Sequence, residues 1–74
     1  MKKSIHTPEY TYFKERLRQA REQADMTQVE AAEKLGRQQS YISNIERGEQ
    51  RVDIVELQRL AKLYGKPLGF FVKK

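Results

Sequence analysis

The chain has 74 residues, with 15 Lys and Arg against 10 Asp and Glu, and its formal net charge is +5. It has no cysteine and a single histidine, His6, so we expect no disulfide, no metal site, no cofactor and no nucleophile–base pair of an enzyme. No apolar run approaches the roughly 20 residues of a membrane span, and the N-terminus lacks the apolar stretch of a signal peptide, which predicts a cytoplasmic domain with no membrane partner.

The chain divides into a basic N-terminal tail, residues 1–7, expected to be flexible, and a single helical domain, residues 8–74. Thr7-Pro8-Glu9 combines a capping hydroxyl, a proline at the first helical position and an acid in the first turn, which predicts a helix start. Apolar residues then recur at helical spacing, so we expect a helix of about 17 residues that ends near Ala24. The apolar stripe consists of Tyr10, Phe13, Leu17, Ala20 and Ala24. Packing is the favoured role of the two aromatics, with base stacking on single strands as the alternative.

A second helix is predicted from Thr27 to Leu35. Thr27 and Glu30 form a capping box, and Val29, Ala32 and Leu35 fall on one stripe. Gly36 follows the last apolar residue, where a left-handed residue ends a helix without a Cβ penalty.

A third helix is predicted over roughly Gln38 to Glu46, with Ile42 and Ile45 facing the core and Arg47-Gly48 as the stop signal. Too few residues separate it from the second helix for an antiparallel hairpin, so the two should cross steeply. This is helix-turn-helix geometry, in which the second helix enters the major groove of DNA.

A fourth helix should begin after Asp53, which forms a capping-box pattern with Glu56, and should end at Gly65. Its predicted core stripe is Ile54, Leu57, Leu60, Ala61 and Tyr64. The apolar residues after Pro67 either cover the core or form a patch for a partner subunit. No segment alternates with period two, so we expect an all-α fold without a sheet.

Cations gather on both sides of the predicted groove-reading helix, as expected for a protein that neutralises phosphates. They are Lys2, Lys3, Lys14, Arg16, Arg18 and Arg21 in the N-terminal part, and Arg37, Arg47 and Arg51 around the third helix. Ordinary solubility would also explain the net charge, so this distribution supports the motif without proving it.

The chain resembles the lambda-repressor-like helix-turn-helix family, of the Cro and XRE type. The resemblance extends from about Phe13 to Phe71, through LRQAREQADMTQVEAAEKLG, QSYISNIERGEQR and IVELQRLAKLYG followed by PLGFF. It implies a compact five-helix domain whose second and third helices form the helix-turn-helix.

The resemblance also implies roles for single residues. An Arg–Glu pair, Arg21 with Glu46, would tie the first helix to the third. Base-reading positions correspond to Gln38, Gln39, Ser40, Tyr41, Ser43 and Asn44. Phosphate contacts correspond to Gln28, Arg37, Arg47 and Arg51. Gln and Asn amides fit the adenine edge, and Gln39 is the first choice for a base reader; any of these residues could instead be solvated or bound to phosphate.

Three positions depart from the family pattern. Ala31 stands where Leu is usual, Arg37 where an apolar residue is usual, and Gln38 where Ser or Thr usually caps the third helix. The exact start of the third helix and the role of Gln38 therefore stay open.

The sequence thus predicts a sequence-specific, double-stranded DNA-binding transcriptional regulator, expected to be a repressor, with no small-molecule substrate. It would bind a palindromic operator as a homodimer. The predicted dimer patch is Tyr64, Leu68, Phe70 and Phe71. The alternatives are a protein-interaction module and an antitoxin- or controller-type protein with the same fold.

Overall fold

Short polar side chains set where the helices begin in the computed structural model, which describes residues 7–73. Thr7 caps α1 (Pro8–Gln23), and its hydroxyl accepts a hydrogen bond from the Tyr10 amide at 3.1 Å. Thr27 and Glu30 form the predicted reciprocal capping box at the start of α2 (Gln28–Leu35). Asp53 caps α4 (Ile54–Tyr64) by accepting from the Glu56 amide at 2.8 Å. These caps satisfy backbone donors that would otherwise lack partners.

The third helix, α3 (Gln39–Arg47), begins without such a cap. Gln38 occupies the N-cap position with an extended backbone, but its side chain makes no capping hydrogen bond. The start of α3 thus lies one residue after Gln38. The side-chain amide of Gln38 makes no capping hydrogen bond and is exposed at the N-terminal end of α3.

Two glycines shape the helix-turn-helix. Gly36 ends α2 with a φ of 78°, and the following amide, of Arg37, donates to the Ala32 carbonyl at 2.9 Å. Gly48 ends α3 with a φ of 77°, and a Cβ added there would lie 2.9 Å from Cδ of Lys14. The left-handed backbone favours glycine at position 48, and the flexible side chain of Lys14 lies against it.

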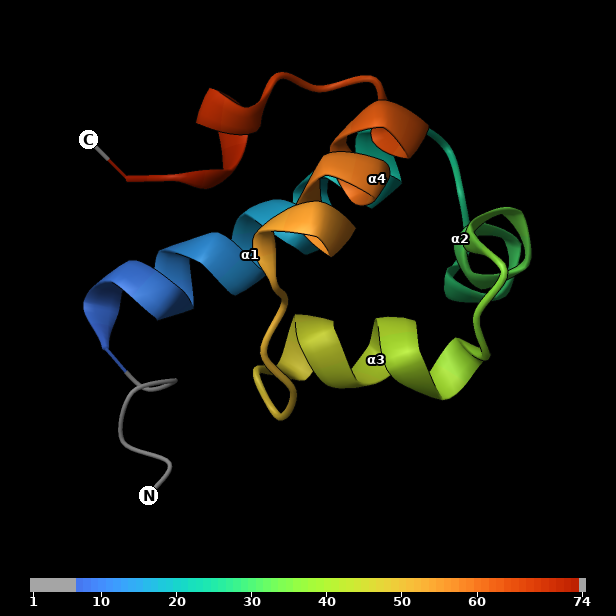
Figure 1. Ribbon diagram of the computed structural model, residues 1–74, viewed down its shortest axis with the longest axis horizontal. Helices are drawn as coiled ribbons and strands as arrows, with labels where there is room; N and C mark the ends of the chain where they lie inside the picture. Colours follow the sequence, from blue (N-terminus) through green and yellow to red (C-terminus); the bar gives the residue numbers. More distant parts are fainter. Residues whose placement is uncertain (1–6, 74) are drawn as a thin grey trace.

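The helices pack around one core (Figure 1). α1 contacts α3, α4 and the final 3-10 helix η2 (Leu68–Phe71), while α2 packs between α3 and α4. In this view α3 runs along one side of the molecule, away from the chain's C-terminal end. The fold within residues 7–73 is therefore all-helical, with four α-helices and one 3-10 helix in place of the five helices expected.

The core confirms most of the predicted stripes. Leu17, Ile42, Ile45 and Leu60, all on predicted stripes, are each at most 1% exposed. Two expectations are wrong: Val29 is 46% exposed and Ile54 is 60% exposed. α2 is wedged between α3 and α4, which moves its buried face to Ala31, Ala32 and Leu35, and Ile54 stands in the first turn of α4, beyond the edge of the core.

Within residues 7–73, no helix has both the length and the apolar character required to cross a bilayer.

Candidate nucleic-acid interface

One edge of α3 faces solvent and carries side chains that can read base edges. Gln38, Gln39 and Ser40 are exposed, while Ser43 and Asn44 are half-buried one turn later. The opposite face of the helix is anchored in the core by Ile42 and Ile45. The predicted reading residues therefore lie along one solvent-facing edge of α3 and its N-cap, with the exception of Tyr41, which is buried.

Tyr41 is only 7% exposed, which leaves little of its side chain for the base contact that was predicted for it. Its ring packs in the core, and the Arg37 guanidinium covers it with Cζ 3.8 Å from the ring centroid. Burial, with the nearby Glu56 carboxylate as a smaller cause, raises the pKa of Tyr41 to about 12. Tyr41 is adjacent in sequence to the predicted reading residues. Its aromatic ring stabilises the fold more when it is buried in the core, because of its large apolar area.

Arg37 is partly occupied within the protein. Besides covering Tyr41, its Nη1 lies 3.3 Å from Oε2 of Glu56, and its side chain is 39% exposed. Arg37, Gln38, Ser40, Tyr41, Asn44 and Gln50 line a polar hollow of about 260 Å³. The guanidinium therefore flanks the reading edge, held from below by Glu56.

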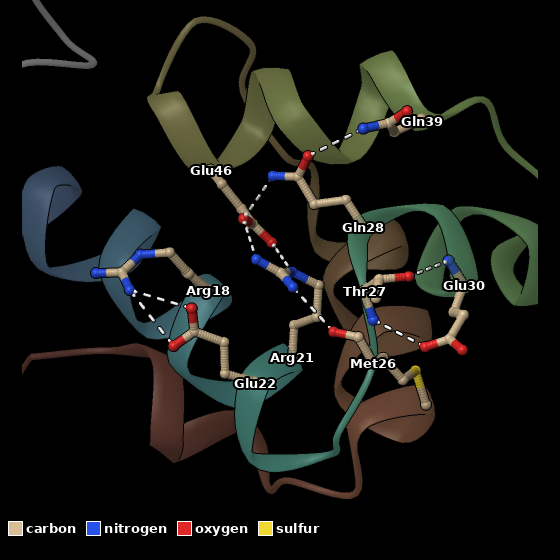
Figure 2. A network of polar contacts seen from close by, with 9 residues as sticks. All are labelled: Arg18, Arg21, Glu22, Met26, Thr27, Gln28, Glu30, Gln39 and Glu46. Atoms are coloured by element: carbon tan, nitrogen blue, oxygen red, sulfur yellow. Dashed lines mark hydrogen bonds and ion pairs between the residues drawn. The ribbon is translucent and has the colours of Figure 1, made fainter.

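The predicted Arg21–Glu46 pair is present and joins α1 to α3 (Figure 2). Arg21 Nε donates to Glu46 Oε2 at 2.7 Å and Arg21 Nη2 donates to Glu46 Oε1 at 3.0 Å. The two side chains are only 10% and 5% exposed. The hydrogen bonds that Arg21 donates to Glu46 raise the pKa of Arg21 above its usual value. Arg21 Nη1 also donates to the Met26 carbonyl at 2.9 Å, so one guanidinium fixes α1, the turn and α3 together.

Glu46 also starts a chain of side-chain amides that ends on the reading edge (Figure 2). Gln28 Nε2 donates to Glu46 Oε1 at 3.1 Å, and Gln39 Nε2 donates to Gln28 Oε1 at 3.3 Å. A carboxylate has no hydrogen to donate, so Gln28 must turn its NH2 group to Glu46 and its carbonyl to Gln39. Gln39 must then offer an N–H to Gln28, which leaves its carbonyl oxygen and its second N–H for a ligand. Gln28 was predicted to contact phosphate, and here its amide supports Gln39.

Arg47 was also predicted to bind phosphate, and in this structure its guanidinium binds α3 itself. Nη1 donates to the Ser43 hydroxyl, Nη2 donates to Asn44 Oδ1 at 2.8 Å, and Nη2 donates to Glu49 Oε1 at 3.1 Å. The hydrogen bond between Arg47 and Glu49 lowers the pKa of Glu49 and raises that of Arg47. Arg47 and Glu49 are 56% and 61% exposed, so this contact lies in solvent at the C-terminal end of α3.

Two contacts at the C-terminal end of α3 were not predicted from the sequence. Glu49 orients Arg47 at a separation of two residues, which no helical spacing rule covers. Lys14 reaches from α1 to the end of α3, where its Nζ lies 3.5 Å from the Arg47 carbonyl. A cation beside the carbonyl end of a helix is favourable, and the spacing of Lys14 from Gly48 could not be known before the fold.

The predicted dimer patch is corrected in part. Tyr64 and Phe71 are 5% and 0% exposed, so they cover the core and are not available to a partner. Phe70 is half-buried beneath Arg16, whose Nε donates to the Phe70 carbonyl at 2.7 Å. Only Leu68 of the four is open to solvent, at 40%. Phe71 is buried because η2 packs against α1 and α4 and closes the core there.

An apolar hollow of about 400 Å³ opens beside this end of the chain. It lies between the start of α1, the loop before α4 and the residues after η2. Its lining includes Tyr10, Phe13, Val52, Ile54, Phe71 and Val72. Ile54 and Val72 are 60% and 51% exposed, which makes its rim apolar.

The other predicted cations are placed as follows. Arg51 is exposed in the loop after α3, with its Cζ 5.8 Å from the Tyr10 ring centroid. Lys2, Lys3 and His6 lie outside the described residues.

Between Thr7 and Lys73, no three His, Cys, Asp or Glu side chains come together in a group that could hold a metal ion.

Comparison with known proteins supports this picture of a helix-turn-helix. The family model described as Helix-turn-helix matches residues 17–71. Among curated proteins, no relative matches. Hydroxypropylphosphonic acid epoxidase from S. wedmorenis is similar in structure, with a TM-score of 0.80 and 29% identity over 88% of this chain and 35% of that chain. Fe(II)-HppE with the alternative substrate (S)-1-HPP gives 0.81 and 28% identity over 90% of this chain and 35% of that one. This chain thus spans about a third of the length of these solved chains.

Proposed function

The chain belongs to the Cro/C1-type, or XRE, family of DNA-binding helix-turn-helix regulators, and from this we propose that it is a transcriptional repressor that binds a palindromic operator as a homodimer. The observation that carries the proposal is the supported amide of Gln39 on the exposed edge of α3. A side chain held in place before binding loses less conformational freedom on binding.

The chemistry of this edge fits double-stranded DNA. The free carbonyl and N–H of Gln39 match the N6 amino group and N7 of adenine in the major groove, and one such bidentate contact discriminates between bases by about 1–3 kcal/mol. Gln38 and Ser40 are exposed on the same edge and extend the reading surface. Exposed side chains of Gln and Ser favour base edges over an apolar protein partner.

Cations on both sides of α3 would hold the phosphates. Arg51 lies after the helix, and Arg37, anchored by Glu56, lies before it. Each phosphate neutralised releases condensed counterions, so binding should weaken steeply with salt.

The size of the domain is compatible with the proposed homodimer. Half-sites of two-fold operators lie about one helical turn apart, roughly 34–36 Å. The protein measures 30 × 25 × 20 Å between Cα atoms, so two copies at that spacing would come into contact, once side chains are added, if their longest axes lie along the DNA. The exposed apolar rim of Ile54 and Val72 is the surface we propose for this contact, in place of the buried Tyr64 and Phe71. Repression would follow from occlusion of a promoter.

The likeness to an epoxidase concerns the helical domain alone. A domain of this fold there forms about a third of a longer chain, at 28–29% identity. We propose that the present chain shares the helical domain and not the chemistry of those enzymes, because its single histidine lies outside the helical domain and no metal-binding group gathers in residues 7–73. The competing roles are a protein-interaction module and an antitoxin- or controller-type protein with the same fold.

Selection of bound sites from random duplex DNA tests the proposal. A repressor of this kind should enrich a palindrome with half-sites one helical turn apart, and binding to it should fall steeply between low and physiological salt. Enrichment of no sequence, or an affinity indifferent to salt, contradicts the proposal and favours the protein-interaction role. Ile54→Lys should separate dimerisation from fold: we expect a monomer in sedimentation, an unchanged helical spectrum and loss of cooperative operator binding.

A further inference from the structure

The contacts of Arg47 are not explained by its predicted role as a phosphate contact. Its guanidinium points back along α3 and binds the side chains of Ser43 and Asn44, both on the reading helix. We infer that Arg47 is a positioning residue that turns hydrogen-bond donors of Ser43 and Asn44 toward the groove, so that the C-terminal half of α3 selects guanine. This inference rests on the proposed DNA-binding function.

The polarity of the contact follows from the chemistry of arginine. A guanidinium carries only N–H donors and no acceptor, so the atom of the Asn44 amide that faces it must be the oxygen. Asn44 Oδ1 accordingly accepts from Arg47 Nη2 at 2.8 Å. The NH2 group of Asn44, with both of its hydrogens, is then turned away from Arg47.

The same reasoning applies one residue earlier. The Ser43 hydroxyl accepts from Arg47 Nη1, so its own proton is free to donate elsewhere. Ser43 and Asn44 are both half-buried on α3, so their freedom to rotate away from this arrangement is limited. Arg47 therefore converts two side chains of mixed character into a pair that offers mainly donors.

Glu49 binds the Arg47 guanidinium directly, while Gly48 and Lys14 act on the backbone beside it. Glu49 Oε1 accepts from Arg47 Nη2 at 3.1 Å, so Nη2 is shared between Glu49 and Asn44. Gly48 lets the chain turn back so that Glu49 can reach Arg47, and the Glu49 amide donates to the Asn44 carbonyl at 2.9 Å. Lys14 Nζ lies near the Arg47 carbonyl on the other side of the helix end.

A donor pair selects a particular base edge in the major groove. Guanine presents two adjacent acceptors there, N7 and O6, whereas adenine presents one acceptor and one donor and cytosine presents a donor. Thymine offers a single acceptor, O4, beside its methyl group. The donors of Ser43 and Asn44 therefore fit guanine best and oppose the amino groups of adenine and cytosine.

The test uses the full chain and a set of duplexes that differ from the selected site at one base pair. The unmodified protein should prefer guanine at a position where Asn44→Ala removes the preference, by roughly 5- to 100-fold. Arg47→Lys keeps the positive charge but cannot form the fork. We expect Arg47→Lys to lose most of the same guanine preference while the salt dependence and the preferences at other positions stay unchanged. The double variant with Asn44→Ala should lose no more than Asn44→Ala alone.

Arg51→Ala is the matched control, since it removes an exposed cation after α3 that has no contact with Ser43 or Asn44. It should weaken all duplexes about equally and reduce the salt slope by about one phosphate. If Arg47→Ala behaves in the same way as Arg51→Ala, or if Asn44 proves to select adenine, the inference is wrong and Arg47 is a phosphate contact. Failure of the proposed function looks different, because the unmodified protein would then prefer no base at any position.

Discussion

The two ends of α3 carry side-chain amides that are oriented by opposite means. At the N-terminal end, Gln39 is fixed through its N–H by a chain that runs inward to the buried Glu46 and Arg21. At the C-terminal end, Asn44 is fixed through its carbonyl by Arg47, whose side chain is 56% exposed. One helix thus presents a carbonyl with one N–H at its start and an NH2 group at its end.

The difference in burial decides how robust each support is. A buried pair is screened little by salt, and removal of one partner leaves an uncompensated charge. Exposed pairs are screened and contribute little to stability. The N-terminal support is therefore expected to matter for folding and reading, and the C-terminal support for reading alone.

The largest effect is expected from breaking the buried support. Arg21→Ala leaves Glu46 buried without its partner and also frees the Met26 carbonyl, so we expect a loss of about 3–5 kcal/mol in the free energy of unfolding. Urea titration followed by circular dichroism measures it. The paired replacement of Arg21 by Met and Glu46 by Leu should cost much less, because no unpaired charge remains. An equal loss in both variants would show that packing, and not charge, explains the effect.

The next effect concerns the amide chain itself. Gln28→Ala removes the acceptor that orients Gln39 but leaves the Arg21–Glu46 pair intact. Discrimination at the base read by Gln39 should fall by about 1–3 kcal/mol, measured with duplexes that differ at that base pair. Gln38→Ala is the control, because its side chain lies outside the chain of amides. A uniform loss for all sequences would identify Gln28 as a phosphate contact.

Alkaline pH should loosen the region beneath the N-terminal half of α3. Tyr41 has a pKa of about 12 in the folded protein and about 10 when unfolded, so above pH 10 the unfolded state holds fewer protons than the folded one. Stability is therefore retained below about pH 10 and lost as pH rises toward 12, by at most about 1.4 kcal/mol per pH unit for one proton. Urea midpoints between pH 8 and 11 should fall less steeply for Tyr41→Phe than for Tyr12→Phe. Equal slopes for the two variants would contradict this.

The smallest effect is expected at the exposed support. Glu49→Gln weakens the hold on Arg47, yet the free energy of unfolding should change by less than about 1 kcal/mol. Added salt should reduce the difference further, since both side chains lie in solvent. Chemical denaturation at two salt concentrations measures it. A large, salt-independent loss would mean that the contact between Arg47 and Glu49 contributes to stability as the buried Arg21–Glu46 pair does.

Local chemistry made much of the fold predictable from sequence. The caps at Thr7, Thr27 and Asp53 and the terminating glycines act within a few residues, so their spacing alone identifies them. The Arg21–Glu46 pair came from the family resemblance, because 25 residues separate the partners and no local rule joins them.

The misplaced residues share one physical cause: each depends on what packs against it. Val29 and Ile54 fit a helical stripe, but the neighbouring helices cover a different face. Tyr41 and Phe71 were placed on the surface, and Tyr64 was placed both on the core stripe and in the dimer patch. All three are at most 7% exposed, because their rings fill a small core. The hydrogen bonds from Arg47 to Ser43 and Asn44 were not predicted, because a guanidinium can bind side chains of its own helix as well as phosphate.

The Arg21 guanidinium has a consequence for the DNA partner. Since it joins α1, the turn and α3 through three hydrogen bonds, α3 cannot tilt or slide without breaking a buried pair. Each protomer is then stiff, and in the proposed homodimer a mismatch in half-site spacing would be absorbed at the contact between the two copies or by bending or twisting of the duplex. Deformable steps such as TA and CA between the half-sites would lower that elastic cost, so base pairs that no side chain touches would still affect affinity.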